Sequence, residues 1–170
     1  NLLELEGLQV IDLEDLACHR GSILGSYTNE PQPTQKYFES KIFETIRKCQ
    51  RDQIVFVESE SRKIGNLSIP DQLFTSIYNS RLIKIENSLK RRVDFLVGEY
   101  PNLMVDQTPI FNLVKFLRKR IPKEDILRIK NHIANREFTK LASDLLSIHY
   151  DKSYNKSLSK RKGKFVKQFN

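Results

Sequence analysis

Several features that would assign the protein to a well-defined class are scarce or missing in this sequence. It has only two cysteines, Cys18 and Cys49, in unrelated surroundings, so neither a disulfide framework nor a cysteine-based metal site is expected. No apolar run approaches the roughly 18 residues that a membrane-spanning helix needs. The composition therefore predicts a reduced, cytoplasmic protein without a membrane partner.

Acidic residues are missing from one end of the chain. The 170 residues carry a net charge of +8, and no Asp or Glu follows Asp151. This last stretch contains Lys152, Lys156, Lys160, Arg161, Lys162, Lys164 and Lys167. Such a block can bind the phosphates of a nucleic acid, or it can be a solvated tail without a partner.

What the chain does contain is a regular alternation of strand and helix patterns. Short apolar runs predict strands at residues 8–13, 53–57 and 81–85, and the segments between and after them predict helices at 34–50, 69–80 and 88–100. Thr34 is the expected N-cap of the first helix. This alternation predicts an α/β fold with a parallel sheet and right-handed crossovers.

The pattern changes after Pro101. Residues 108–121, 123–136 and 137–148 each have helical periodicity, and no strand is evident among them. We therefore predict an α/β core at residues 1–100, a helical subdomain at 101–150 with a boundary near 101–107, and a mobile basic tail at 151–170.

Pairs of carboxylates follow the first two predicted strands. Asp12 and Glu14 follow the first strand, and Glu58 and Glu60 follow the second. Residues two apart on extended backbone point to the same side, so the two members of each pair are expected to converge. Carboxylates at strand ends can hold Mg²⁺ or exchange a proton with a reacting group. Asp12 and Glu58 are the candidate metal ligands.

Each of these residues also has a structural interpretation. Asp12 can cap the helix that follows it, the Glu58–Ser61 run can be a solvated loop, and His19 can be a hydrogen-bonded core histidine. The combination of several polar clusters at one sheet edge favours a ligand site, because open parallel sheets bind ligands beyond the carboxyl ends of their strands. Arg62 and Lys63 suit phosphate, and Gly65 can let the backbone approach a ligand.

Long segments of the chain resemble the P-loop half of bacterial tRNA 2-selenouridine synthases. The resemblance is carried by QVIDLEDLACHRGSILG, PQPTQKYFES and VFVESESRKIGNLSIPDQLF, and further along by RVDFLVGEY and LLSIHYDKSY. It extends from about Leu8 to Tyr154, in the same order and with similar spacing.

The resemblance implies an enzyme that modifies tRNA. Members of this family replace the sulfur of a wobble 2-thiouridine with selenium from selenophosphate, through an S-geranylated base made from geranyl diphosphate. They combine a rhodanese-like domain with a P-loop domain of P-loop-NTPase-like fold. The implied partners are tRNA and the rhodanese-like domain of the same protein.

The resemblance also suggests roles for the candidate residues. We expect Asp12, Glu14, Glu58 and Glu60 to form a catalytic polar network or to hold Mg²⁺. The residues expected to contact diphosphate or tRNA phosphate are His19, Arg20, Gly21, Ser22, Ser61, Arg62 and Lys63. Gln32 and Gln35 are expected to hydrogen-bond a base or sugar, and His149, Tyr150 and Tyr154 to stack or bond at the helical end.

One family feature is missing from this sequence. No Gly-x-x-x-x-Gly-Lys-Ser/Thr run occurs in it, so we expect the chain to begin just after that loop and to be inactive alone. Two alternatives remain open at this point. One is a small-molecule P-loop kinase, and the other is a non-catalytic RNA-binding module whose basic residues supply the affinity.

Overall fold

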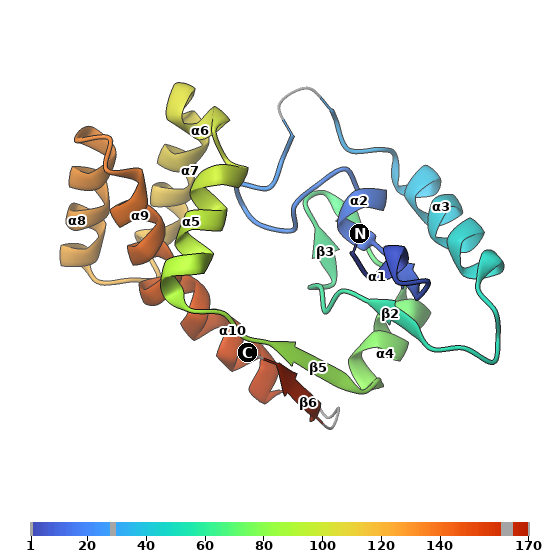
Figure 1. Cartoon of the computed structure of the whole chain (residues 1–170). Coiled ribbons are helices and arrows are strands. Elements are labelled where there is room, and N and C mark those ends of the chain that lie inside the picture. The colour runs from blue at the N-terminus through green and yellow to red at the C-terminus, as the bar shows by residue number, and fades with distance from the viewer. Residues whose placement is uncertain (1, 28–29, 161–164, 170) are drawn as a thin grey trace. The chain divides into compact units, whose positions relative to one another are not determined.

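The computed structural model describes residues 2–27, 30–160 and 165–169. The chain divides into two compact units, residues 1–80 and 81–170 (Figure 1). The predicted division near residues 101–107 differs from this one, because the segment 81–100 belongs to the second compact unit. Among the described residues, no helix has both the length and the apolar character to cross a bilayer.

The first unit is built on two short parallel strands. β1 (Gln9–Ile11) pairs with β2 (Val55–Val57), with Val10 opposite Phe56. Helix α1 (Leu2–Leu5) precedes β1, α2 (Leu13–Leu16) follows it directly, and α3 (Gln35–Lys48) lies on the crossover to β2. The predicted parallel pairing of these strands is confirmed. The predicted cap is confirmed too, because the Thr34 hydroxyl accepts a hydrogen bond from the Tyr37 N–H at 3.3 Å.

A small hairpin lies in the segment that we expected to be a loop. β3 (Lys63–Ile64) and β4 (Leu67–Ser68) are antiparallel and are followed by α4 (Asp71–Asn79), whose N-cap residue is Pro70. The turn uses Gly65 at a φ of +59°, which favours glycine. A side chain there would meet Gln32 Oε1 at 2.2 Å, so within the described structure Gly65 makes room for a protein side chain, where we had expected a ligand.

The core of the first unit joins the strands, the hairpin and three helices. Its fully buried members include Leu13 of α2, Phe38 of α3 and Ile64 of β3. The remaining buried members are Ile11, Ala17, Ile42, Leu67, Ile69 and Ile77. The hairpin is therefore fixed to the sheet by the same apolar cluster that places α2.

The second unit is mainly helical. It contains α5 (Leu89–Glu99), α6 (Asn102–Val105), α7 (Thr108–Leu117), α8 (Lys123–Ala134), α9 (Phe138–Leu145), the π-helical turn η1 (Leu146–Tyr150) and α10 (Asp151–Ser159). The predicted helices are confirmed. Residues 151–159 form helix α10, which continues α9 and η1, whereas the sequence predicted that they belong to a mobile tail. Arg161, Lys162 and Lys164 lie outside the described residues.

The third predicted strand exists but belongs to a different sheet. β5 (Leu82–Ile85) pairs in parallel with β6 (Phe165–Phe169), which includes Lys167. The expected single sheet of three or more strands is therefore wrong for the described residues, and the sheet beside the candidate site has two strands. The mixed α/β class is confirmed.

Candidate functional site

The carboxylates of Asp12 and Glu58 meet where β1 ends and α2 begins. Asp12 is the N-cap of α2, and its Oδ1 accepts a hydrogen bond from the Asp15 N–H at 2.9 Å. Glu58 follows β2, and its Oε2 accepts from the Leu13 N–H at 2.8 Å. The two carboxyl groups are also hydrogen-bonded to each other. The capping interpretation of Asp12 is thus confirmed, but the carboxylate that Asp12 meets is Glu58 and not Glu14, with which it was expected to converge.

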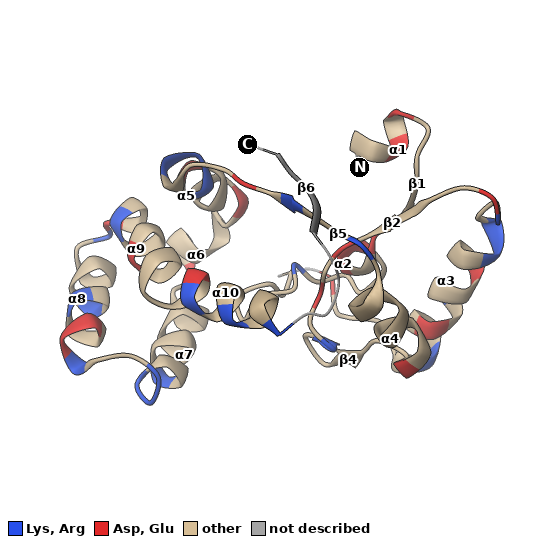
Figure 2. Ribbon diagram, turned by 90° about the horizontal axis from the view of Figure 1, so that it is seen from below, with Lys and Arg blue, Asp and Glu red and all other residues tan. Residues whose placement is uncertain are grey.

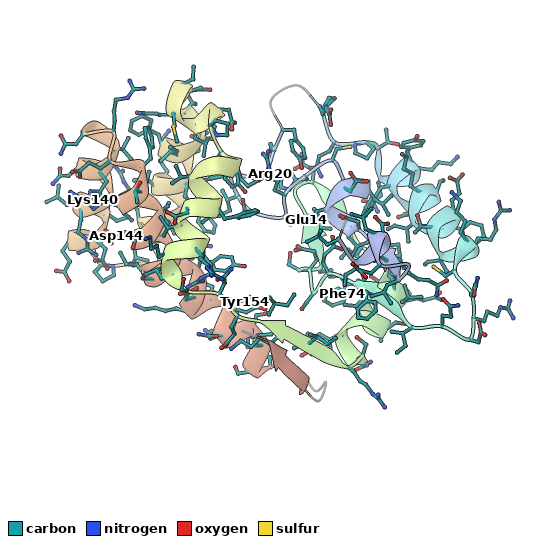
Figure 3. The ribbon with its side chains drawn as sticks, viewed as in Figure 1. Glu14, Arg20, Phe74, Lys140, Asp144 and Tyr154 are labelled. Carbon is teal, nitrogen blue, oxygen red and sulfur yellow. The ribbon has the colours of Figure 1, made fainter. Side chains whose placement is uncertain are left out.

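The second carboxylate pair, Glu14 and Glu60, lies around Gly21. Figure 3 shows Glu14 on α2 and Arg20 on the loop that follows α2. A Cβ atom placed on Gly21 would lie 2.3 Å from Glu14 Oε1 and 3.1 Å from both carboxylate oxygens of Glu60. Gly21 also has a φ of +67°. Glycine at this position lets one carboxylate from α2 and one from the loop after β2 approach the backbone closely.

The charges in this cluster favour protonated carboxyl groups. Burial raises the pKa of Glu14 to about 7, and the nearby Glu60 and Asp12 carboxylates add to the rise, while Arg20 opposes it. Burial and the hydrogen bond to Asp12 raise the pKa of Glu58 to about 8. Burial also raises the pKa of Glu60. Both pairs can therefore hold a proton near neutral pH, because neighbouring carboxylates resist ionising together.

This arrangement does not by itself fit the predicted magnesium site. One oxygen of Asp12 and one of Glu58 already accept backbone hydrogen bonds. In the described parts of the chain, no group of three or more His, Cys, Asp or Glu side chains is arranged to hold a metal ion. A proton shared between the two carboxyl groups accounts for the hydrogen bond between them without a metal ion.

His19 is a buried, neutral histidine at the edge of the same cluster. Its side chain is 4% exposed, and its Nδ1 accepts a hydrogen bond from the Gly21 N–H at 3.1 Å. Acceptance at Nδ1 places the ring proton on Nε2, and burial lowers the His19 pKa. The ring is wedged between two glycines, since a Cβ on Gly25 would lie 2.9 Å from Cε1 and one on Gly65 2.8 Å from Cδ2.

A cavity of about 360 Å³ adjoins His19. It is lined by His19, Gly21, Ser22, Ile23, Ser26, Gln32, Lys63, Gly65 and Asn66. Five of the predicted site residues, namely His19, Gly21, Ser22, Gln32 and Lys63, are therefore gathered around one space. Lys63 supplies a positive charge there, as an anionic ligand would require.

Gln32 and Gln35 brace the hairpin. The Gln32 side-chain N–H groups donate to the carbonyls of Ala17 at 3.2 Å and Ile64 at 2.9 Å, and its Oε1 accepts from the Asn66 N–H at 2.8 Å. Gln35 likewise binds both the N–H and the carbonyl of Ser68, at 2.9 Å and 2.8 Å. In this structure both amides bind the backbone of the hairpin, and Gln35 also donates to Glu39 Oε1 at 2.7 Å, which differs from the predicted contact to a base or sugar.

The remaining predicted residues of the first unit take other partners. The Arg20 guanidinium lies 4.3 Å from the ring centre of Tyr27. Arg62 forms an ion pair with Asp71 at the start of α4 and lies 5.6 Å from the ring centre of Phe74. Ser61 donates from its hydroxyl to the Lys63 carbonyl at 2.5 Å and from its N–H to Glu60 at 3.3 Å. Arg62 is thus directed to α4, whereas Ser61 supports the Glu60 loop.

The other three predicted residues belong to the second unit. The His149 ring meets Phe116 edge-on, with ring centres 6.3 Å apart. Tyr150 and Tyr154 are stacked with ring centres 5.8 Å apart and planes at 9°. These residues therefore make two separate aromatic contacts, one between η1 and α7 and one between η1 and α10.

Sequence reasoning missed four residues of the site. Ile23, Ser26 and Asn66 line the cavity, and Gly25 packs against His19. Their signal in the sequence is weak, because no local pattern predicts the β-bridge between His19 and Ser26 that folds the loop back on itself. Gly25 was the one signal in the sequence, because it is a second glycine close to His19 and glycine allows a close approach to the backbone.

Comparison with known proteins gives a consistent result. The family model described as the tRNA 2-selenouridine synthase AAA domain matches residues 2–115. A tRNA 2-selenouridine synthase of Nitrosomonas eutropha is 32% identical over 145 residues, which cover 82% of this chain and 36% of the relative. The Bdellovibrio bacteriovorus protein of the same name is 41% identical over 101 residues, covering 56% and 26%.

The chain spans about a third of the length of the curated relatives that it matches. No solved structure matches it significantly. The matched region contains both carboxylate pairs, the buried histidine and the whole lining of the cavity. The chain belongs to the tRNA 2-selenouridine synthase family.

Proposed function

We propose that the full-length protein replaces the sulfur of a wobble 2-thiouridine in tRNA with selenium, and that the first unit of this chain binds the diphosphate and phosphate groups involved. The observation that carries the proposal is the family match over residues 2–115, which includes the whole carboxylate and histidine cluster. The substrates are the tRNA, selenophosphate and geranyl diphosphate, with an S-geranylated base between the two half-reactions.

The cavity beside His19 suits a diphosphate or selenophosphate anion. Lys63 contributes a positive charge, and neutral His19 keeps an N–H at Nε2 that can donate a hydrogen bond. Ser22 adds a hydroxyl group at the cavity wall. One cation with several neutral donors binds a phosphate group without requiring a metal ion.

Glu14 and Glu60 are proposed as the proton-transfer pair. Gly21 lies between this pair and the cavity, because it lines the cavity and closely approaches both carboxylates. A carboxyl group with a pKa of about 7 can release a proton to a leaving group and regain it at neutral pH. Asp12 and Glu58 are proposed to hold α2 and the Glu60 loop in place.

The architecture and partners follow the same proposal. We propose that β1, β2 and the helices around them are part of a P-loop-like domain, acting in the cytoplasm with a rhodanese-like domain of the same protein. A small-molecule kinase and a non-catalytic RNA-binding module are less well supported, because the matched family is named for a synthase.

The test is tRNA modification by the full-length protein. We expect Glu60→Gln and Lys63→Ala each to reduce the 2-selenouridine content of tRNA at least about tenfold, measured by mass spectrometry of nucleosides. Gln72→Ala, on the exposed side of α4, is the matched control and should leave the content unchanged. Wild-type levels of 2-selenouridine in both variants, or none in the wild type, would refute the proposal.

A further inference from the structure

We infer that the second unit carries a platform for unpaired RNA bases, made by Phe116 on α7, Arg120 in the turn after α7 and His149 on η1. The choice of RNA as the ligand rests on the proposed function. The inference goes beyond it by locating the contact and by naming single-stranded RNA as the form that is bound.

The centre of this platform is a guanidinium group held against an aromatic ring. The Arg120 Cζ lies 3.5 Å from the ring centre of Phe116. Arg120 also donates from Nη1 to the Phe116 carbonyl at 3.0 Å, which fixes the side chain over the ring. Both residues are exposed, with Phe116 at 38%. A guanidinium plane fixed in this way is a surface on which a nucleobase can stack.

His149 closes one side of the platform. Its ring meets Phe116 edge-on at 81°, and both burial and the nearby Arg120 lower its pKa. A neutral imidazole beside the guanidinium can stack on a base or hydrogen-bond to its edge. His149 occupies a π-helical turn, a rare element that often occurs at functional sites.

A second stack follows directly along the chain. Tyr150 and Tyr154 lie nearly parallel, and 51% and 36% of their surfaces are exposed. Buried tyrosines would be explained by core packing, but these two rings face solvent to a large extent. Figure 3 labels Tyr154 on α10. The pair adds further ring surface next to His149 in the sequence.

The charge around the platform matches a polyanion. Residues 107–123 contain no acid and five cations, namely Lys115, Arg118, Lys119, Arg120 and Lys123, all of them exposed. Figure 2 shows Lys and Arg gathered at the connection between α7 and α8. Clustered cations attract phosphates of any nucleic acid, whereas exposed aromatic and guanidinium planes favour bases that are not already paired and stacked.

The experiment compares two RNAs with the whole 170-residue chain. One is a short hairpin with an unpaired loop that carries 2-aminopurine, and the other is a fully paired duplex of equal length. Binding is measured by fluorescence anisotropy over a salt series, and base stacking by quenching of 2-aminopurine. We expect the hairpin to bind more tightly than the duplex and its fluorescence to be quenched.

The decisive variant is Arg120→Lys, which keeps the charge and removes the guanidinium plane. We expect it to weaken hairpin binding at least about fivefold, to reduce quenching, and to leave duplex affinity and the salt slope unchanged. Tyr154→Leu should also reduce hairpin binding selectively. Arg118→Lys is the matched control, since the described structure gives Arg118 no ring contact, and it should bind as the wild type does.

Each other result overturns the inference. Equal affinity for hairpin and duplex means that the cations bind backbone phosphate alone. Unchanged hairpin binding in both Arg120→Lys and Tyr154→Leu means that bases do not stack there. Failure of the platform is separable from failure of the proposed function, because binding needs no turnover. A protein that makes 2-selenouridine but binds both RNAs equally would refute only the platform.

Discussion

Glu58 accepts a hydrogen bond at 2.8 Å from the backbone N–H of Leu13, a residue 45 positions earlier in the chain. This bond connects the loop after β2 to the first turn of α2. Asp12 caps the same turn and is bonded to Glu58, so the Glu58 carboxyl group links the end of β2 to the end of β1. The relationship explains how Glu14 and Glu60, which lie two residues after Asp12 and Glu58 respectively, come to face Gly21.

Replacing Glu58 should separate its hydrogen bonds from its charge. Glu58→Ala leaves the Leu13 N–H without its partner, and we expect a loss of about 1–3 kcal/mol in the free energy of unfolding. Glu58→Gln keeps a carbonyl oxygen for Leu13 and an N–H group for Asp12, so it should cost less than about 1 kcal/mol at pH 7. Chemical denaturation measures both. A glutamine variant as unstable as the alanine variant would contradict the shared proton.

The stability of the protein should also depend on pH in a defined direction. Folding raises the pKa values of Glu14 and Glu58 to about 7 and about 8, so the folded state binds more protons than the unfolded state above pH 4.5. The contribution of these groups to stability is complete below pH 4.5 and is lost as the pH rises through 7 and 8. Glu58→Gln should flatten this part of the stability curve, and an unchanged curve would contradict the raised pKa.

Gly21 and Gly7 form a matched pair for testing the close approach of the carboxylates. Both have positive φ, but a Cβ on Gly7 meets nothing within 4 Å, whereas one on Gly21 meets Glu14 and Glu60. Gly7→Ala should cost about 1–2 kcal/mol from backbone strain alone. Gly21→Ala should cost up to about 1 kcal/mol more, because two half-buried carboxylates must move. Equal losses in thermal unfolding would place the carboxylates away from Gly21.

The pKa of Glu14 should move in opposite directions when its two charged neighbours are neutralised. Glu60→Gln removes a carboxylate that raises the pKa of Glu14, so the pKa should fall. Arg20→Gln removes a cation that lowers it, so the pKa should rise. Titration of the Glu14 carboxyl carbon by NMR measures both shifts. An unchanged pKa in both variants would mean that burial alone controls this group.

In the second unit, the ion pair of Arg92 and Asp151 joins α5 to α10. Its two hydrogen bonds measure 2.6 Å and 3.0 Å, and the hydrogen bond from Arg92 lowers the pKa of Asp151. A lowered pKa contributes stability at neutral pH that is lost as the pH falls below the ordinary range of aspartate. Asp151→Asn should therefore destabilise the unit by about 1 kcal/mol at pH 7, and the difference should be smaller at pH 3 than at pH 7. Thermal unfolding at both values checks this.

Local signals predicted most of the helices and the first strand pair. The Thr34 side chain caps the N-terminus of α3, so a single residue type indicated where this helix begins. The spacing of apolar residues places Phe38 and Ile42 on the buried face of α3. The β3–β4 hairpin has only two residues in each strand, too few for a periodic pattern. The partner of β5 could not be found either, because β6 lies about 80 residues away in a stretch dominated by lysine.

The candidate site shows the same limit. Carboxylates at strand ends indicated convergence, and the structure does gather Asp12, Glu14, Glu58 and Glu60. Each carboxylate was expected to meet the one two residues away in the sequence. The observed pairs instead join the start of α2 to the loop after β2, Asp12 with Glu58 and Glu14 with Glu60 around Gly21. The chain turns into α2 directly after Asp12, so the extended geometry on which the first expectation depended ends there.

Gln32 and Gln35 have a consequence for local motion. Their side chains accept hydrogen bonds from the N–H groups of Asn66, in the turn of the hairpin, and of Ser68, on β4. Gln32 precedes α3, and Gln35 is its first residue. Opening the hairpin would break its bonds to both glutamine side chains, and Gln32 also binds the Ala17 carbonyl, so these parts should fluctuate as one cooperative unit. The amide hydrogens of Asn66 and Ser68 should then exchange with deuterium at similar rates, far slower than those of an ordinary exposed turn. A ligand that enters the cavity beside His19 would therefore displace the hairpin and Gln32 together, because both line that cavity.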